Sequence, residues 1–177
     1  MRSLLTAGVT CLVALAPLTA QADEVDVDMH QISKDGVGAS IGTVKATDGA
    51  DGLMLELDLT GLQAGPHGFH VHEHGSCDMA EKDGAMVSGL SAGGHYDPHG
   101  SGKHLGPTGE GHLGDLPLIE VGDGGQPVMA SLTVPRLKVS DIRGRALMIH
   151  EGGDNYSDEP KPLGGGGARV ACGVIPE

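Results

Sequence analysis

The chain has 177 residues, with 31 glycines and 10 prolines but only one Phe and no Trp. This length predicts a single domain. Its 24 acidic residues outnumber 11 basic ones and give a formal charge of −13, which argues against nucleic acid as a partner because the phosphates would be repelled.

Residues 1–22 are predicted to be a secretory signal peptide, which leaves residues 23–177 as the folded domain. Arg2 provides a positive end, residues 4–17 are apolar but short for a bilayer span, and Ala20 and Ala22 have the spacing of a cleavage site. An uncleaved buried helix is the weaker interpretation, because the stretch has no alternating polar face. Loss of Arg2 leaves ten basic against 24 acidic residues, so the charge moves from −13 to −14. No second hydrophobic segment follows, and we expect no membrane span.

Short β-strands are predicted along the rest of the chain. Residues 25–32 alternate apolar and polar side chains, and residues 53–62 place leucines on one face and acidic residues on the other. Further strands are predicted at residues 39–46, 127–134 and 146–150, between clusters of Gly, Asp and Pro. No stretch of ten or more residues has a convincing helical period. The pattern predicts an all-β sandwich or barrel of antiparallel strands.

Two further features restrict the fold. Removal of the signal peptide takes Cys11 with it and leaves Cys77 and Cys172, which allow one intramolecular pairing, and a disulfide is the default in an oxidising compartment. The connection at residues 88–115 is longer than a simple loop in a compact domain, and loops of this length are usually functional or disordered.

Histidines gather around that connection and the segment before it. The sequence GFHVHEHGSC at residues 68–77 places His70 and His72 on one face of a strand, with Cα atoms about 7 Å apart, so both can bind one ion. Further along the chain, three histidines follow at spacings of nine and eight residues: His95, His104 and His112. After them come the carboxylate of Asp115 and a further imidazole, His150. Three imidazoles with one carboxylate suit zinc, and an all-imidazole set suits copper.

Five motifs in order, GFHVHEHGSC, AGGHYDP, KHLGPTGEGHLGDLP, MIHEGGDN and GARVACGVI, resemble copper/zinc superoxide dismutases of the bacterial exported type. The resemblance covers about residues 25–175. It implies an eight-stranded Greek-key β-barrel with immunoglobulin-like sandwich architecture and two long loops over a metal site outside the barrel. It also implies an oxidoreductase in the periplasm that acts on the superoxide anion, as a homodimer or a monomer.

The resemblance also implies a role for each site residue. It assigns one copper per subunit to His70, His72, His95 and His150, and one zinc per subunit to His95, His104, His112 and Asp115. His95 would therefore bridge the two ions, and during turnover it would release copper and take up a proton. The resemblance further implies that Asp154 hydrogen-bonds one ligand of each metal, that Arg169 beside copper attracts the substrate, and that Cys77 pairs with Cys172.

Three other histidines and two lysines are not assigned to either metal site. A loop role is favoured over metal capture for His74, and His67 and His99 are predicted to face solvent. Lys82 and Lys103 are candidates for attracting superoxide, with solvated loop charges as the alternative interpretation.

Two other functions stay open at this point. A copper-handling module without turnover would be expected to lack a copper ligand or the site arginine, whereas His150 and Arg169 are both present. An extracellular zinc-binding protein would bind zinc without consuming superoxide. A zinc hydrolase is disfavoured, because the expected zinc has four protein ligands and no open position.

Overall fold

The computed structural model describes residues 22–177, so the predicted signal peptide, apart from Ala22, lies outside the described residues. The main sheet has seven antiparallel strands in the order β5-β10-β11-β1-β2-β3-β9. Their bounds are β1 Glu24–Ser33, β2 Gly36–Gly49, β3 Gly52–Leu59, β5 Phe69–His72, β9 Val128–Val134, β10 Ala146–His150 and β11 Arg169–Val174. Two further antiparallel pairs join β4 Gly65–His67 to β8 Ile119–Val121, and β6 Ala80–Lys82 to β7 Ala85–Val87.

The predicted strands are confirmed, with small differences at their ends. β3 buries Leu53, Leu55, Leu57 and Leu59 and exposes its acidic residues, because alternate side chains of a strand point to opposite faces. The prediction extended this strand to residue 62, but it ends at Leu59 because Gly61 turns the chain with a φ of 74°. Leu62 is buried all the same, outside the strand.

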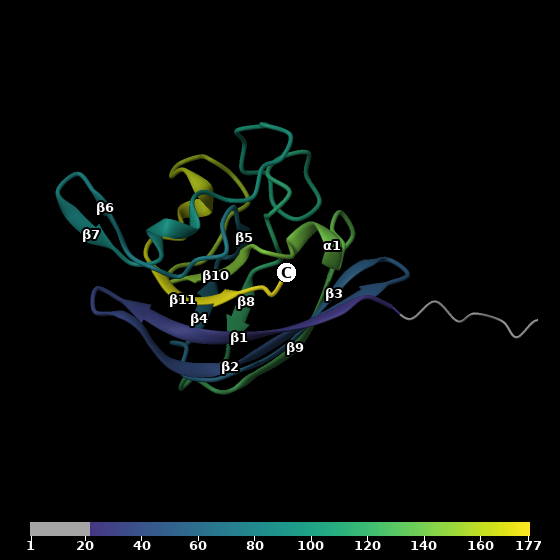
Figure 1. The fold of residues 1–177 in the computed structure, drawn as a ribbon, viewed down its shortest axis with the longest axis horizontal. Helices are drawn as coiled ribbons and strands as arrows, with labels where there is room; N and C mark the ends of the chain where they lie inside the picture. Colours follow the sequence, from purple (N-terminus) through teal and green to yellow (C-terminus); the bar gives the residue numbers. More distant parts are fainter. Residues whose placement is uncertain (1–21) are drawn as a thin grey trace, which may run out of the picture.

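The sheet curls around an apolar core, and this confirms the all-β barrel class. Figure 1 shows β1, β2, β3 and β9 as one curved layer, with β5, β10 and β11 lying across its concave side. Phe69, the one Phe of the chain, is fully buried in the core between them. The other core side chains are mostly Val, Leu and Ile.

Two long irregular segments lie over the outer side of β5 and β10 (Figure 1). Residues 88–118 contain only the short helix η1 Leu90–Ala92, which confirms the predicted long loop, and residues 151–168 contain only η2 Leu163–Gly165. The one α-helix of the described residues, α1 Val139–Ile142, has four residues. No helix within residues 22–177 is long and apolar enough to cross a membrane.

Candidate metal centre

Strand β5 contributes the first two histidines. Phe69 and Val71 point into the core, so His70 and His72 point to the opposite face. That face is covered by the long loop, and both imidazoles are therefore fully buried. Burial of two polar rings requires partners for their nitrogen atoms.

The long loop returns to the free edge of β5 at two points and brings further donors there. His95 lies opposite His72, and Asp115 lies opposite His70, each in an isolated antiparallel bridge. Between them the Val71 N–H donates to the Gly114 carbonyl oxygen at 2.9 Å. Gly114 is required at this approach, because a Cβ there would lie 2.3 Å from the Val71 carbonyl oxygen.

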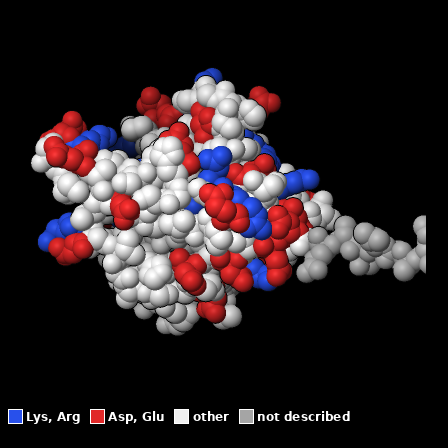
Figure 2. All heavy atoms as spheres, viewed as in Figure 1, with Lys and Arg blue, Asp and Glu red and all other residues white. Residues whose placement is uncertain are grey.

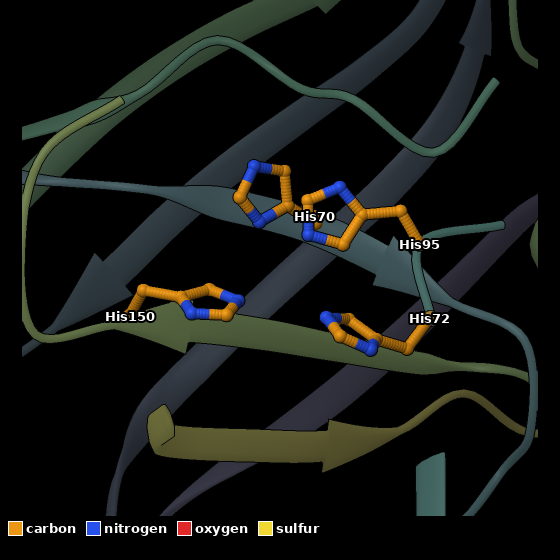
Figure 3. Close-up of side chains that lie close together, drawn as sticks. All are labelled: His70, His72, His95 and His150. Atoms are coloured by element: carbon orange, nitrogen blue, oxygen red, sulfur yellow. The ribbon is translucent and has the colours of Figure 1, made fainter. Parts of the chain in front are cut away.

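Four imidazoles meet around one space. His70 and His72 from β5, His95 from the loop and His150 at the end of β10 each place a ring nitrogen within 4.8 Å of the others. Figure 3 shows the four rings gathered over β5 and β10. The Nδ1 of His70 and the Nε2 atoms of His72 and His150 are buried and have no hydrogen-bond partner. Because unpaired buried nitrogens are costly, this all-imidazole group fits a copper ion.

The other nitrogen of each of these rings is fixed by the protein. The Nδ1 of His72 donates to the Gly93 carbonyl oxygen at 3.0 Å, and the Nδ1 of His150 donates to the Gly167 carbonyl oxygen at 3.2 Å. These bonds fix the ring orientation and the tautomer, and they leave the Nε2 lone pairs directed into the shared space.

A second group of donors surrounds Asp115. One of its carboxylate oxygens, Oδ1, lies 3.0 Å from the Nδ1 of His95, 3.0 Å from that of His104 and 3.4 Å from that of His112. The ligand atoms of His70, His95, His104 and Asp115 all lie within 4.8 Å of one another, and the Nδ1 of His112 lies 3.4 Å from the Oδ1 of Asp115. The Nδ1 atoms of His104 and His112 are buried and have no hydrogen-bond partner. Three imidazoles around one carboxylate fit a closed zinc site.

Asp154 connects the two groups. Its Oδ2 accepts a hydrogen bond from the Nε2 of His70 at 2.8 Å, and its Oδ1 accepts one from the Nε2 of His104 at 2.7 Å. Each of these histidines then keeps its Nδ1 for an ion. Gly164 packs against this carboxylate with a φ of 68°, and a Cβ at that position would lie 2.0 Å from Oδ1.

Burial keeps the copper-type histidines neutral, which is the form that binds metal. Desolvation, with a smaller contribution from the charge of His95, lowers the pKa of His70 to about 3 and holds that of His72 well below its usual value. Burial likewise lowers the pKa of His150 to about 4. Burial acts against the charge of His104 too, but the close Asp115 carboxylate and the hydrogen bond to Asp154 raise its pKa to about 9.

The two carboxylates are ionised for a related reason. Burial opposes the charge of Asp115, but the close imidazole of His104 and a hydrogen bond from His95 lower its pKa far below the usual range. Burial also opposes the charge of Asp154, and hydrogen bonds from His104 and His70 outweigh it and lower the pKa. Both side chains are therefore negatively charged at neutral pH.

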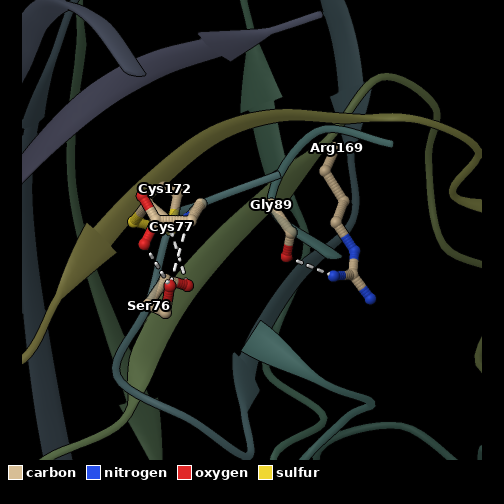
Figure 4. The surroundings of a disulfide bond; sticks show 6 residues. Ser76, Cys77, Gly89, Arg169 and Cys172 are labelled. Atoms are coloured by element: carbon tan, nitrogen blue, oxygen red, sulfur yellow. Dashed lines mark hydrogen bonds between the residues drawn. A yellow bond between two sulfur atoms is a disulfide. The ribbon is translucent and has the colours of Figure 1, made fainter. Parts of the chain in front are cut away.

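Arg169 starts β11 and lies at the edge of the imidazole group. Its guanidinium donates to the carbonyl oxygens of Gly89 and Gly93, the latter at 2.7 Å. Figure 4 shows its bond to the carbonyl oxygen of Gly89 and, apart from it, the disulfide. The disulfide joins Cys77 to Cys172, whose Cα atoms lie 5.7 Å apart, and it links the segment after β5 to the last strand.

The histidines outside these groups divide into two classes. His99 is exposed, as predicted, and His74, for which a loop role was favoured, is exposed as well. The prediction for His67 was wrong, because this residue is only 3% exposed. Its ring lies between two carbonyl oxygens, with the Nδ1 2.7 Å from that of His150 and the Nε2 2.9 Å from that of Gln63. Nothing in the sequence distinguishes it from a loop histidine, because its partners are backbone atoms brought close by the fold.

Two side chains that support the Asp115 group were also missed. Asp158 accepts a hydrogen bond from the backbone N–H of His104 at 2.9 Å. Arg136 donates to the carbonyl oxygens of Gly111 and His112, at 2.9 and 3.4 Å. No motif indicates these roles, because each contact joins a side chain to the backbone of a distant segment.

Comparison with known families agrees with this geometry. A family model described as copper/zinc superoxide dismutase (SODC) matches residues 40–175. The chain belongs to the copper/zinc superoxide dismutase family. The superoxide dismutase [Cu-Zn] of Escherichia coli (strain K12) is 52% identical over 166 residues, which cover 93% of this chain and 95% of the relative.

Solved structures of the family agree in fold as well. The copper/zinc superoxide dismutase from Brucella abortus superimposes with a TM-score of 0.84 at 49% identity, covering 86% of this chain and 99% of that one. The protein from Salmonella enterica, described as a monomeric copper, zinc superoxide dismutase, has a TM-score of 0.77 at 51% identity, with coverage of 86% and 99%. The family match over residues 40–175 therefore includes every segment that carries a residue of the two donor groups.

Proposed function

We propose that this chain catalyses the dismutation of superoxide outside the cytoplasm, with copper bound by His70, His72, His95 and His150 and zinc bound by His95, His104, His112 and Asp115. Membership of the copper/zinc superoxide dismutase family supports the activity and both cofactors. The observation that carries the residue assignment is the set of five buried ring nitrogens without partners. They belong to His70, His72, His104, His112 and His150, and all lie around His95 and Asp115.

The reaction converts two superoxide anions and two protons into O₂ and H₂O₂. Copper held by the four imidazoles would supply the redox chemistry of the reaction. Zinc held by the Asp115 group would have a structural and electrostatic role. One ring nitrogen of His95 lies 3.0 Å from Asp115. Because the Nδ1 of His95 faces Asp115, the Nε2 of His95 would be the atom that holds a proton and delivers it to the substrate.

Arg169 attracts the anionic substrate. The protein has a formal charge of −13, so its overall field repels superoxide and a local positive potential has to overcome it. On the face seen in Figure 2, lysines and arginines are interspersed among acidic residues. The half-buried Arg169 guanidinium, held by backbone oxygens, provides a fixed positive charge next to the imidazole group. Lys82 and Lys103 are exposed and remain candidates for a supporting role.

Export to the periplasm, with cleavage after Ala22, completes the proposal. Its support is the charged and apolar pattern of residues 1–22 together with the Cys77–Cys172 disulfide, a bond that persists in oxidising compartments. Mass spectrometry of the protein isolated from a periplasmic fraction tests it. A chain that retains residues 1–22 would contradict this part of the proposal.

Metal analysis and turnover test the function together. We expect purified protein to contain one copper and one zinc per chain and to consume superoxide, with inhibition by cyanide, which blocks an accessible copper. His150→Ala should abolish turnover and leave zinc bound. Retained activity in this variant would refute the copper assignment, and zinc binding without superoxide consumption after copper addition would refute the activity.

A further inference from the structure

We propose that a cleft between β1, β2, β4 and β11 binds small amphipathic cations, and that His67 transmits their binding to His150. The cleft has a volume of about 300 Å³. Small-molecule sites begin at about this volume, and a cavity of half the size accommodates one benzene ring. A molecule of one or two rings with a short polar chain therefore fits.

An irregularity in the sheet opens this cleft. In the β1–β2 ladder His30 pairs with Ser40 and Ile32 pairs with Val37, so Gln31 has no partner on β2. The ladder is shifted by a bulge at this point, and bulges bend a strand away from its neighbour. Gln31 and Gly38 line the space that results.

The lining determines the chemistry of the ligand. Ile32, Leu62 and Val170 provide apolar walls, and Gln31 and Gln63 provide amide groups. Among the described residues Glu151 is the one carboxylate that lines the cleft, and no lysine or arginine lines it. A ring can bury its apolar surface against the walls while an ammonium group lies near Glu151. The net charge of −13 also favours a positively charged ligand.

His67 connects the cleft to the imidazole group. It lines the cleft and is buried, and its Nε2 lies 2.9 Å from the carbonyl oxygen of Gln63, which lines the cleft as well. Its Nδ1 lies 2.7 Å from the carbonyl oxygen of His150. A ligand that displaces Gln63 therefore acts on the backbone of His150 through one rigid ring. This coupling, unlike the binding itself, rests on the proposed role of His150 as a copper ligand.

Three probes with one ring system and different charges test the binding. Tryptamine is a cation, tryptophol is neutral and indole-3-acetate is an anion. With the copper- and zinc-loaded protein, isothermal titration should give tryptamine an affinity about fivefold higher than tryptophol, the effect of one partly exposed ion pair, with indole-3-acetate weaker still. Equal affinities for the three probes, or no binding, would overturn the proposal.

Cleft variants locate the site. Gly38→Leu should fill the cleft, since a Cβ there meets only the Gln31 backbone oxygen at 3.4 Å and the Gln31 Cβ at 3.8 Å. Ala39→Leu is the matched control, because Ala39 is exposed and does not line the cleft. We expect tryptamine affinity to fall at least about tenfold in Gly38→Leu, in proportion to the loss of a buried ring contact, and to stay unchanged in Ala39→Leu. Equal affinity in the two variants would place the binding elsewhere and overturn the proposal. Glu151→Gln should abolish the preference for tryptamine over tryptophol, and a retained preference would overturn the role of Glu151.

The copper spectrum tests the coupling. Saturating tryptamine should shift the visible absorption band of bound copper in the unmodified protein and leave that of Gly38→Leu unchanged. A shift that persists in Gly38→Leu indicates direct coordination of the amine and overturns the coupling, and so does tryptamine binding without any shift. If His150→Ala retains copper and activity, the proposed function fails, yet titration with tryptamine still decides whether the cleft binds cations.

Discussion

His150 and Arg169 lie opposite each other in the ladder between β10 and β11. The pairing places the backbone of a proposed copper ligand beside that of the cation proposed to attract the substrate. The guanidinium is fixed at its other end, because it donates to the Gly93 carbonyl oxygen, which also accepts the bond from His72. Adjacent strands and one shared oxygen therefore determine the position of the charge relative to two of the imidazoles.

Arg169→Gln should slow superoxide consumption while metal content stays the same. Loss of local attraction lowers the rate of encounter, and we expect kcat/KM to fall about tenfold and to depend less on ionic strength. Pulse radiolysis at several salt concentrations measures both effects. Lys34→Gln, at an exposed position on the β1–β2 turn, is the matched control. An equal loss in both variants would show that net charge, and not Arg169, governs the encounter.

Asp154→Ala should weaken both metal sites at once. Alanine has no side-chain oxygen to accept the hydrogen bonds that His70 and His104 donate. Loss of such an orienting contact lowers metal affinity by about 10- to 100-fold. Competition with chelators for copper and for zinc measures this. Asp51→Ala, in an exposed turn, should leave both affinities unchanged.

A weakening of only one metal by Asp154→Ala would show that Asp154 supports that site alone. In that case the connection between the two groups would have to run through His95, whose ring stacks on that of His70 with centroids 3.8 Å apart.

Local patterns predicted the strands well, because alternation of apolar and polar residues has the period of a strand half-buried in a sheet. The sequence FHVH could also predict that His70 and His72 share a face. It could not predict that His95 and Asp115 would lie opposite them, because those bridges depend on a loop returning to the edge of β5. The resemblance to a known family provided that grouping.

The error at His67 has a similar cause. Its environment consists of two backbone oxygens from segments far apart in sequence, one four residues before it and one 83 residues after it. Burial of such a ring follows from the path of the chain around β4 and β10, and composition contains no information about that path. The same holds for Arg136 and Asp158.

Arg136→Gln should weaken zinc binding without affecting copper. Arg136 donates to the carbonyl oxygens of Gly111 and His112 and so restrains the end of the loop that carries His112. Its loss leaves that loop freer, and we expect zinc to dissociate about tenfold faster, as for other contacts that orient a ligand. Chelator-driven release of zinc, followed spectroscopically, measures the rate. Arg143→Gln is the matched control, since Arg143 contacts Asp23 and Glu177 instead, and acceleration of zinc release in that variant as well would point to a general loss of stability.

Replacement of Cys77 and Cys172 by serine should lower the free energy of unfolding by about 4 kcal/mol, because the cross-link spans 95 residues and restricts the unfolded chain. Urea denaturation of the metal-free protein measures it. Reducing agent should destabilise the unmodified protein by a similar amount and leave the double variant unchanged. Equal stability of the oxidised protein and the variant would mean that strain in the folded state cancels the entropic gain.

The metal-free protein should be most stable near neutral pH and less stable on both sides. His70 and His150 have folded-state pKa values of about 3 and about 4, below the ordinary 6.5, so the unfolded chain binds protons first and stability falls as the pH drops from about 6.5 toward 4. His104 has the opposite sign. Its pKa of about 9 means that its contribution is complete below pH 6.5 and is lost as the pH rises toward 9.

Calorimetry of the metal-free protein between pH 4 and pH 9 tests this balance, and we expect the Tm to decrease by several degrees toward each end. His104→Ala should remove the decrease on the alkaline side only. Because metal ions require neutral imidazoles, loaded protein should resist acid until protons compete for the nitrogens. A Tm of the metal-free protein that rises steadily from pH 6.5 to pH 9 would contradict the assigned ionisation of His104 between its two carboxylates.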